Sequence, residues 1–448
     1  MRLRFALAAL AAASTLLFFE ADASANGRFP EANQISFSVK DPNAVYLRVT
    51  FGLLVSRDRG KTWDWVCEQA IGFSGVEDPM YASTPNGSII GTTFQGVTQS
   101  RDDACTWSFA TGALEKQVFI DLSQNPSDAK NVVAYASSYD KQDDAGNILF
   151  NNRVFETKDE GASWAELPGA LDQSLLGYTI DLTKSDPDRL YLTAVRDPGT
   201  TPRGYLLVSR NKGQSWEELE VPLVDSERAV WIAAVDPTNA NKLWLRTSNG
   251  TDKPTRLMTL DLDPDGGAPT IKTVYTGKGA LLGFALSTDG TKVWIGGNKD
   301  GLLQANTTDL QFVQKSNVEI QCLSYADDGL WACSNERSGF VAGLSKDEGS
   351  TFQPLLHFCD IRGPLACDPA STQATVCGPA WPAQKATLGC GGDLDGGFGD
   401  GGRLDGGDEP LAPPSDNCNC RAAPSNPWAA IVTAGLAALA VLRLRRRR

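Results

Sequence analysis

The stretch from Ser56 to Trp63, "SRDRGKTW", decides the fold because the chain repeats it. Near-copies begin at Ser100 ("SRDDACTW"), Thr157 ("TKDEGASW"), Ser209 ("SRNKGQSW") and Ser345 ("SKDEGSTF"). A catalytic site is needed once, whereas a structural joint recurs wherever the architecture repeats. These five copies, called the repeated turns below, therefore indicate a repeat protein.

Each repeated turn links two β-rich segments through polar residues, as in a β-hairpin. In the first copy, Gly60 can adopt a positive φ without a Cβ clash, and Asp58 can accept hydrogen bonds from the N–H groups of the turn. Trp63 then leaves the turn as a large apolar side chain suited to packing between sheets. The matching residues of the other copies are Asp102 and Trp107; Asp159, Gly161 and Trp164; Asn211, Gly213 and Trp216; and Asp347 and Gly349. We expect a structural role for all of them.

Three departures from the pattern support this interpretation. Ala104 replaces the expected Gly, Asn211 replaces Asp, and Phe352 replaces Trp. Asn still offers a carbonyl oxygen and Phe still fills space, so each change keeps part of the turn's structural role. Drift of this kind is typical of a joint and would damage a catalytic site.

The spacing of the repeated turns gives the number of repeats. Successive copies start 44, 57, 52 and 136 residues apart. The last interval holds three repeats of about 45 residues, so two repeats have lost their turn. We therefore predict an all-β fold, a seven-bladed β-propeller with four-stranded antiparallel blades. Each blade reads complete from its first strand to its fourth, so the seventh blade should pack on the first without a swapped strand.

The repeated turns spell Ser-x-Asp-x-Gly-x-Ser/Thr-Trp, and over about residues 33–357 the chain resembles the Asp-box (BNR-repeat) β-propellers of the sialidase and sortilin-like superfamily. In that family the box lies at the turn from the third to the fourth strand, away from the usual ligand face. The resemblance implies the fold and leaves the function open. The sequence favours a non-catalytic propeller that recognises a protein or glycan, and the alternative is a sialidase-like glycoside hydrolase.

A hydrolase of that kind would need an arginine cluster for a carboxylate, a Tyr–Glu nucleophile pair and an acidic proton donor. Arg28, in "GRFP", resembles the family's Arg-x-Pro start, but no order-matched set of further arginines follows, and the only histidine is His357. We therefore assign no catalytic residue. Three arginines converging near a Tyr–Glu pair would favour the enzyme. The longest inserts follow Tyr139 and Val195, which predicts a binding face on blades three and four.

The ends of the chain predict export and anchoring. Residues 1–25 have the charge, apolar run and small-residue pattern of a signal peptide. After the propeller at 26–357 come a Cys-rich strap at 358–390 and a Gly/Asp/Pro-rich spacer at 391–417. Residues 418–448, with Cys418, Cys420, an apolar run and terminal arginines, resemble the myxobacterial C-terminal sorting signal. The run of fifteen residues would span about 22 Å, a marginal length. We expect anchoring in the membrane by this segment, at the cell surface or outer membrane.

Ten cysteines in an exported chain indicate disulfide bonds. If Ala326 pairs with Gly329 in the hairpin "CLSYADDGLWAC", Cys322 lies opposite Cys333, within the distance that a disulfide spans. Four further cysteines are expected to staple the strap: Cys359, Cys367, Cys377 and Cys390. Elimination then leaves Cys67 and Cys105 as a pair.

Charge and composition limit the partners. The formal charge is −13, and −18 without the five C-terminal arginines, which argues against nucleic acid. No cofactor is expected. Asp261, Asp263 and Asp265 have the spacing that opens a calcium loop, but Lys272 stands where the loop needs a bidentate Glu. A solvated turn that replaces a lost repeated turn is the favoured explanation. We expect a monomer with an unidentified protein or glycan partner.

Overall fold

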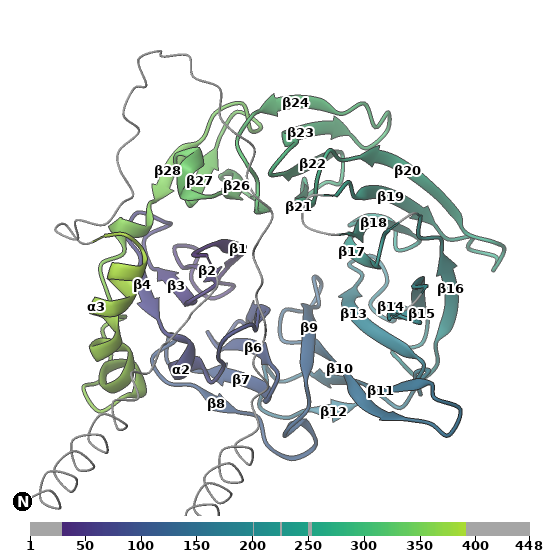
Figure 1. The fold of residues 1–448 in the computed structure, drawn as a ribbon, viewed down its shortest axis with the longest axis horizontal. Coiled ribbons are helices and arrows are strands. Elements are labelled where there is room, and N and C mark those ends of the chain that lie inside the picture. The colour runs from purple at the N-terminus through teal and green to yellow at the C-terminus, as the bar shows by residue number, and fades with distance from the viewer. Residues whose placement is uncertain (1–28, 200, 225, 250–252, 391–448) are drawn as a thin grey trace, which may run out of the picture. The chain divides into compact units, whose positions relative to one another are not determined.

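The computed structural model describes residues 29–199, 201–224, 226–249 and 253–390. Seven four-stranded antiparallel sheets follow one another around a ring (Figure 1). The predicted all-β, seven-bladed propeller is thus confirmed. The expected signal peptide, the spacer and the sorting segment lie outside the described residues, as do Arg28, Cys418 and Cys420. Within the described ranges, no helix combines the length and the apolar character needed to cross a bilayer.

The strands of blades 1 to 3 are β1 (Ala32–Phe37), β2 (Val45–Val49), β3 (Gly52–Ser56) and β4 (Asp64–Val66); β5 (Tyr81–Ser83), β6 (Ile89–Thr93), β7 (Gly96–Ser100) and β8 (Ser108–Phe109); β9 (Phe119–Gln124), β10 (Val132–Gln142), β11 (Ile148–Thr157) and β12 (Ala165–Glu166). Those of blades 4 and 5 are β13 (Leu175–Leu182), β14 (Leu190–Arg196), β15 (Arg203–Ser209) and β16 (Glu217–Val221); β17 (Ala229–Val235), β18 (Lys242–Ser248), β19 (Arg256–Asp261) and β20 (Thr270–Thr276). Those of blades 6 and 7 are β21 (Leu281–Leu286), β22 (Lys292–Gly297), β23 (Gly301–Asn306) and β24 (Val313–Ser316); β25 (Cys322–Ala326), β26 (Gly329–Cys333), β27 (Ala342–Ser345) and β28 (Gln353–Leu356).

Antiparallel strand order divides the connections between two faces of the ring. The repeated turns join the third and fourth strands of blades 1, 2, 3, 4 and 7, and they share one face with the turns between first and second strands. We call this the turn face. The hairpins between second and third strands and the connections between blades occupy the opposite side, called the hairpin face. Blades 5 and 6 lack the repeated turn, as the spacing predicts.

The bonds inside the first repeated turn hold it in one conformation. Asp58 accepts hydrogen bonds from the Thr62 amide (2.9 Å) and from the hydroxyl groups of Thr62 (2.6 Å) and Ser56 (2.9 Å). Gly60 donates its N–H to Ser56 Oγ (2.8 Å) at a φ of 83°, in the left-handed region that favours glycine. The same bonds recur in the other four copies. Asn211 keeps the acceptor at Oδ1 and donates through Nδ2 instead.

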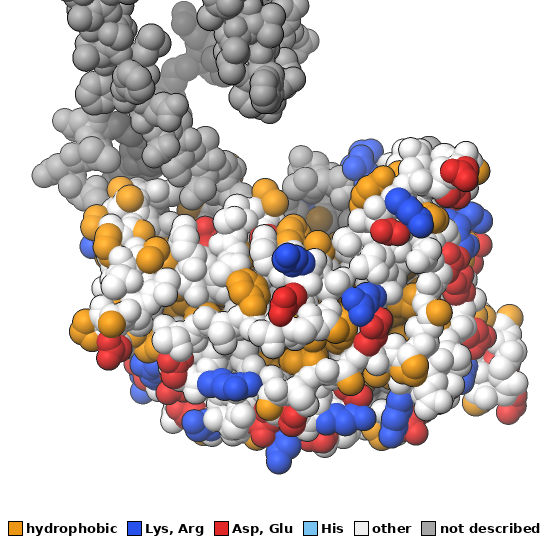
Figure 2. Space-filling model, turned by 90° about the horizontal axis from the view of Figure 1, so that it is seen from below, with side chains coloured by type: hydrophobic (Ala, Val, Ile, Leu, Met, Phe, Trp, Pro, Cys, Tyr) orange, Lys and Arg blue, Asp and Glu red, His pale blue; other side chains and the backbone are white. Residues whose placement is uncertain are grey.

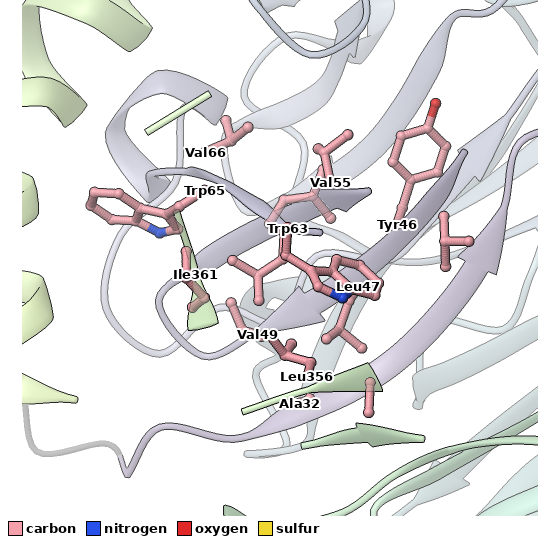
Figure 3. Close-up of a cluster of buried hydrophobic side chains, with 14 of the residues drawn as sticks. Ala32, Tyr46, Leu47, Val49, Val55, Trp63, Trp65, Val66, Leu356 and Ile361 are labelled. Atoms are coloured by element: carbon pink, nitrogen blue, oxygen red, sulfur yellow. The ribbon is translucent and has the colours of Figure 1, made fainter. Parts of the chain in front are cut away.

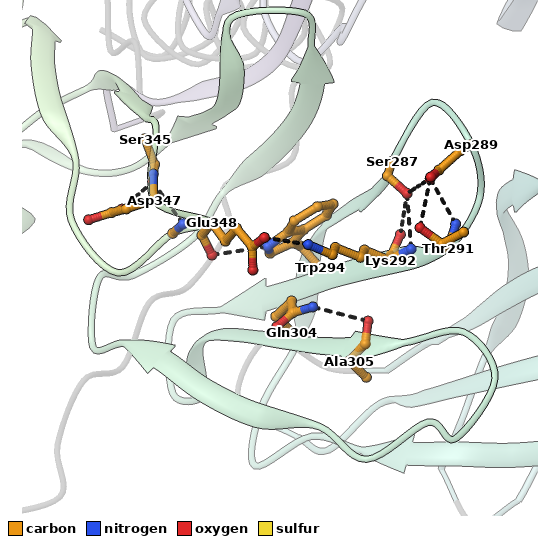
Figure 4. A network of polar contacts seen from close by, with 11 residues as sticks. Ser287, Asp289, Thr291, Lys292, Trp294, Gln304, Ala305, Ser345, Asp347 and Glu348 are labelled. Atoms are coloured by element: carbon orange, nitrogen blue, oxygen red, sulfur yellow. Dashed lines mark hydrogen bonds and ion pairs between the residues drawn. The ribbon is translucent and has the colours of Figure 1, made fainter.

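The repeated turns also join each blade to the one before it. Arg59 pairs with Asp328 of blade 7 (2.8 Å), and Trp63, 1% exposed, donates its indole N–H to Leu355 O of the same blade (3.1 Å). In blade 7, Glu348 pairs with Lys292 of blade 6, beside the turn that Ser287 and Asp289 close (Figure 4). The repeated turn thus supplies polar and packing contacts at junctions between blades.

Blade 1 packs on blade 7 without a shared strand, as predicted. Leu356 from β28 and Ile361 from the strap enter the same buried cluster as Trp63, Val55 and Ala32 of blade 1 (Figure 3). Burial of apolar side chains at about 25 cal/mol per Å² is the main stabilising contribution at such a junction. The ring is therefore closed by side-chain packing.

The strap covers the outer edge of blade 1. It contains a short helical turn at Gln373–Cys377 and the helix α3 (Gly378–Thr387). The Trp65 amide of β4 donates to Gly363 O (2.8 Å), and the Leu365 amide donates to Trp65 O (2.8 Å). The ring of Trp381 in α3 lies 5.4 Å from that of Trp65. The strap thus pairs with strand β4, which would otherwise expose backbone groups at the sheet edge.

Four disulfides are present in the described residues, and they correct one expectation. Cys322 lies opposite Cys333 in the register of β25 and β26, and the two are bonded with a Cα–Cα distance of 4.7 Å. The elimination argument for Cys67 and Cys105 was wrong: Cys67 bonds to Cys377 and Cys105 bonds to Cys367. Only Cys359–Cys390 lies within the strap. The argument failed because the strap runs along β4 and past the repeated turn of blade 2, where it meets both ring cysteines.

Candidate functional site

The innermost strands turn one edge toward the axis of the ring, and polar side chains of the preceding blade satisfy amide groups on these edges. Asp121 Oδ2 accepts from the Ile180 amide (2.9 Å), and Thr179 Oγ1 accepts from the Ile232 amide (3.1 Å). Gln34 Oε1 accepts from the Tyr81 amide at 3.3 Å. These bonds meet the rule that buried N–H groups need partners. Much of the polarity around the axis is therefore structural.

Two carboxyl groups on the inner strands of blades 3 and 4 have strongly shifted pKa values. Burial raises the pKa of Asp121, 7% exposed, to about 8, against the hydrogen bond from the Ile180 amide and with a further rise from the nearby Asp181. Burial also raises the pKa of Asp181 to about 7, against the hydrogen bond from Ser123 Oγ (3.0 Å). The pair can therefore hold protons near neutral pH, which is the property that acid–base catalysis uses.

A second group lies near the hairpin face of blades 4 to 6. Trp231 of β17 is the cross-strand neighbour of Arg246 in β18, whose guanidinium carbon lies 4.8 Å from the centre of the indole ring. Tyr178, at the bulge of β13, packs on the same indole at 5.9 Å. Arg246 Nη1 donates to Leu281 O of blade 6 (2.8 Å). The three side chains, called the Arg246 cluster below, connect three blades at the axis.

The longest hairpin lies in blade 3, where the insert after Tyr139 predicts it. Strands β10 and β11 run for 11 and 10 residues, whereas β2 and β3 of blade 1 have five each. In blade 4, Arg196 at the base of the β14–β15 hairpin pairs with Asp172 (2.6 Å) and Glu218 (3.1 Å). Blade 3 thus has the longest hairpin, whereas the β14–β15 hairpin of blade 4 (Leu190–Ser209) spans as many residues as the β18–β19 hairpin of blade 5 (Lys242–Asp261).

A sialidase-like enzyme would bring three arginines together near a Tyr–Glu pair. Arg48, Arg246 and Arg256 instead bond to separate groups of the protein. Arg48 Nη1 donates to Asp78 O (3.1 Å), Arg246 bonds to Leu281 O, and Arg256 pairs with Glu227 (2.6 Å). Tyr81 has Arg48 and acidic side chains near it, but it is 4% exposed and burial raises the pKa of its hydroxyl. The buried, protonated hydroxyl of Tyr81 cannot contact a substrate as a nucleophile.

The repeated-turn residues named from the sequence all lie on the turn face, away from the groups at the axis. Asp263, from the possible calcium loop, accepts from the Asp265 amide (2.8 Å) in the turn between β19 and β20. Over the described part of the chain, no three His, Cys, Asp or Glu side chains gather as metal ligands would. His357 directly follows the last strand, β28, and its Nδ1 lies 2.7 Å from Glu336 Oε1.

A groove of about 390 Å³ lies on the outer side of the ring, between blades 2 and 3. Arg101, Phe109 and Trp164 contribute to its lining. The guanidinium of Arg101 already donates to Gln99 Oε1 (3.1 Å) and Gly161 O (3.2 Å). Figure 2, which views this side of the ring, shows apolar and charged side chains intermixed. This groove is not the candidate site, because the Arg101 guanidinium already donates to acceptors of the protein itself.

Sequence reasoning missed the residues at the axis. Asp121 lies in β9, Tyr178 and Asp181 lie in β13 and Arg246 lies in β18, and no motif joins them. A polar residue inside an apolar run, such as Asp121 in "VFIDLSQ", was the one available signal.

No protein-family model and no curated protein matches the chain. Among solved structures, an ancestral GH74 enzyme aligns with a TM-score of 0.52 and 15% identity, over 72% of this chain and 46% of that one. YCF48 from Cyanidioschyzon merolae aligns with a TM-score of 0.46 and 13% identity, over 68% and 92%. The β-propeller domain of Cps50 (Swd1) from Myceliophteria thermophila aligns with a TM-score of 0.45 and 11% identity, over 69% of this chain and 95% of that one. This chain spans less than half the length of the GH74 enzyme. The similarity shows the propeller fold. It does not distinguish a binding protein from a glycoside hydrolase.

Proposed function

We propose that the protein is an exported, non-catalytic binding propeller that recognises a protein or glycan partner through the hairpin face of blades 3 and 4. The β10–β11 hairpin carries this proposal. It projects beyond the neighbouring strands of blade 3 (Figure 1) and exposes Tyr139 by 63% and Ile148 by 45%. Exposed aromatic and aliphatic side chains on a projecting element are typical of binding surfaces.

The hairpin tip has a defined conformation. Asp143 Oδ1 accepts from the amides of Ala145 (3.0 Å) and Asn147 (2.8 Å), and Asp143 Oδ2 accepts from Asn147 Nδ2 (2.9 Å). A preorganised element loses less conformational entropy when it binds. The hairpin can therefore contribute its apolar side chains at low entropic cost.

The test compares a Tyr139→Ser/Ile148→Ser variant with the wild-type mature protein. Both are applied to a glycan array and to immobilised surface proteins from the producing cell. We expect the variant to lose the captured partner. The matched control is Val313→Ser, which changes an apolar side chain that is 62% exposed on the outer strand β24. Equal capture by wild type and the hairpin variant would contradict the proposal.

We further assign the repeated turns to the Asp-box (BNR) class and residues 418–448 to a sorting signal that retains the protein at the cell surface. Four disulfides support an extracellular location. The order of Cys, apolar run and arginines supports the anchor. A chain truncated after Asn417 should appear in the medium, and immunoblots of cells and medium measure this. Retention of the truncated chain on cells would exclude the anchor.

A glycoside hydrolase is the second candidate, because Asp121 and Asp181 have raised pKa values at the axis. Hydrolysis of a glycosidic bond needs one carboxyl group that stays protonated and one that ionises. Aryl sialosides and xyloglucan oligosaccharides are suitable substrates. Turnover by the wild type that Asp121→Asn and Asp181→Asn abolish, in variants that fold, would favour the enzyme over the binding protein.

A further inference from the structure

The tryptophan of the repeated turn makes a characteristic hydrogen bond in blades 1 and 2. Its indole N–H donates to the backbone carbonyl of the residue three positions before it. Trp63 donates to Gly60 O at 3.0 Å, and Trp107 donates to Ala104 O at 3.1 Å. This bond satisfies a polar group that the packing of the ring would otherwise leave unmet.

The repeated turn of blade 3 lacks this bond. Its matching carbonyl, Gly161 O, accepts instead from Arg101 Nη2 of blade 2 at 3.2 Å. Trp164 Nε1 is buried and has no hydrogen-bond partner among the residues that the structure describes. Buried donors in folded proteins nearly always have a partner, so an unmet one indicates a place for a ligand or a water molecule.

Trp164 belongs to the wall of the groove of about 390 Å³ between blades 2 and 3. Phe109 of β8 lies in the same wall and is 39% exposed, and Ser108 and Thr111 add hydroxyl groups beside it. A Cβ on Gly72 would lie 2.7 Å from the Phe109 ring, so the glycine makes room for the ring in this position. The groove thus combines two aromatic rings, hydroxyl groups and an unmet N–H donor.

The charges around the groove favour an uncharged ligand. Arg101 is the one charged side chain among the described residues that line it, and its guanidinium already donates to Gln99 Oε1 and Gly161 O. An anion therefore meets an occupied cation, and a metal ion meets no carboxylate. A purely apolar ligand would leave the indole N–H and the hydroxyl groups without partners.

A pyranose ring fits these requirements, because it has C–H faces that pack on aromatic rings and hydroxyl groups that donate and accept hydrogen bonds. We propose that the groove binds one neutral sugar residue, with a C–H face on Phe109 and a hydroxyl oxygen that accepts from Trp164 Nε1. The groove lies on the outer side of the ring, apart from the β10–β11 hairpin. The inference therefore goes beyond the proposed function and adds a second site.

Ligand-observed NMR titration of the mature protein tests this inference. The probes are the methyl glycosides of glucose, galactose, mannose and N-acetylglucosamine. Glucitol, which has no ring, and glucuronate, which is charged, are the controls. We expect at least one methyl glycoside to bind more tightly than both controls. Binding by none of the four, or tighter binding of glucuronate, would overturn the proposal.

Variants connect the binding to this groove. Trp164→Phe removes the indole N–H and keeps an aromatic ring, and it should raise the Kd several-fold. Phe352 occupies the same position in the turn of blade 7, so the turn accepts this residue. Trp216→Phe is the matched control, because Trp216 Nε1 also lacks a partner in the described chain but lies outside the groove. It should bind as the wild type does.

Phe109→Ser tests the stacking contact independently and should also raise the Kd several-fold. Unchanged affinity in whichever of the Trp164 and Phe109 variants folds would overturn the proposal. The hairpin variant Tyr139→Ser/Ile148→Ser should bind the glycoside as the wild type does, whether or not it captures the partner. Loss of glycoside binding in the hairpin variant would place the sugar on the hairpin face and overturn the proposal as well.

Discussion

Asp58 shows at the scale of one residue how the repeated turn works. Burial by itself would raise the pKa of Asp58, but hydrogen bonds from the Thr62 hydroxyl and amide and from Ser56 hold the pKa below its ordinary value of 3.8. The carboxylate therefore stays ionised and accepts hydrogen bonds from donors of the turn that have no other acceptor. Its role is local to one junction between blades.

Asp58→Ala should lower the free energy of unfolding by about 1–3 kcal/mol, because the Thr62 amide loses its acceptor. Any ligand affinity of the folded fraction should stay nearly unchanged, since the turn face lies opposite the hairpin face. Melting temperature and binding, measured side by side, check both statements. Asp144→Ala, an exposed change in the β10–β11 hairpin, is the stability control. Normal melting with abolished binding would show that the turn belongs to a functional site.

Gly60→Val should be worse than Asp58→Ala. Gly60 has a φ of 83°, and an added Cβ would lie 3.0 Å from Trp331 and 3.1 Å from Leu355 of blade 7. A β-branched residue there combines backbone strain with crowding at the junction. Ala104 shows that one Cβ is accepted at the same turn position of blade 2, at a φ of 72°. Urea unfolding of both variants gives the comparison, and equal stability would contradict the strain argument.

At the scale of elements, the strap forms the strongest covalent link in the ring. Cys67–Cys377 and Cys105–Cys367 join residues 310 and 262 positions apart and tie the segment after blade 7 to blades 1 and 2. Cys322–Cys333 closes a loop of only 11 positions. Disulfides that close longer loops restrict the unfolded chain more. The strap therefore closes the ring a second time, in addition to the packing of blade 7 on blade 1.

Removing Cys67–Cys377 by a double change to Ala should cost about 4 kcal/mol, compared with about 3 kcal/mol for Cys322–Cys333, if chain entropy dominates. The cost stays below that of a fully open loop because Cys105–Cys367 remains and shortens the loop that the lost bridge closes. Thermal and urea unfolding of the two double variants would measure the difference. Peptide mapping without reduction confirms that the remaining bridges keep their partners. A larger loss for the hairpin bridge would show that local packing, and not chain entropy, sets the contribution.

For the whole molecule, carboxyl groups set opposite responses to pH. The pKa of Asp181 rises from 3.8 to about 7 on folding, so the stability it contributes is complete below 3.8 and is lost as pH rises through about 7. The pKa of Asp347 falls to about 2, because it accepts hydrogen bonds from Thr351 and Ser345. Its contribution is present above 3.8 and is lost as pH falls toward 2. The two effects place the stability maximum in mildly acidic solution.

Asp181→Asn should therefore reduce the loss of melting temperature between about pH 5 and about pH 8, because one buried ionisation disappears. Asn keeps a carbonyl oxygen for the Ser123 hydroxyl. Asp140→Asn, an exposed change, should leave the pH profile as in the wild type. Parallel profiles for wild type and Asp181→Asn would mean that Asp181 does not take up a proton on folding.

The sequence by itself determined the repeat. Spacing of the turns gave seven blades, and the residues Asp58, Gly60 and Trp63 gave the hairpin, because turn chemistry and strand register depend on residues close together in the chain. The pairing of Cys322 with Cys333 followed from the same local register. The turn and the hairpin register can each be recognised within about 10–20 residues, and the blade count follows from the intervals between such windows.

Only the tertiary structure decided the partners of Cys67 and Cys105 and the grouping of Tyr178, Trp231 and Arg246. Several cysteine pairings satisfy the same composition, and the path of the strap along β4 selects one of them. The Arg246 cluster draws on blades 4, 5 and 6, whose inner strands meet only when neighbouring blades pack side by side. Contacts between blades depend on the curvature of the whole ring and leave no local pattern in the sequence.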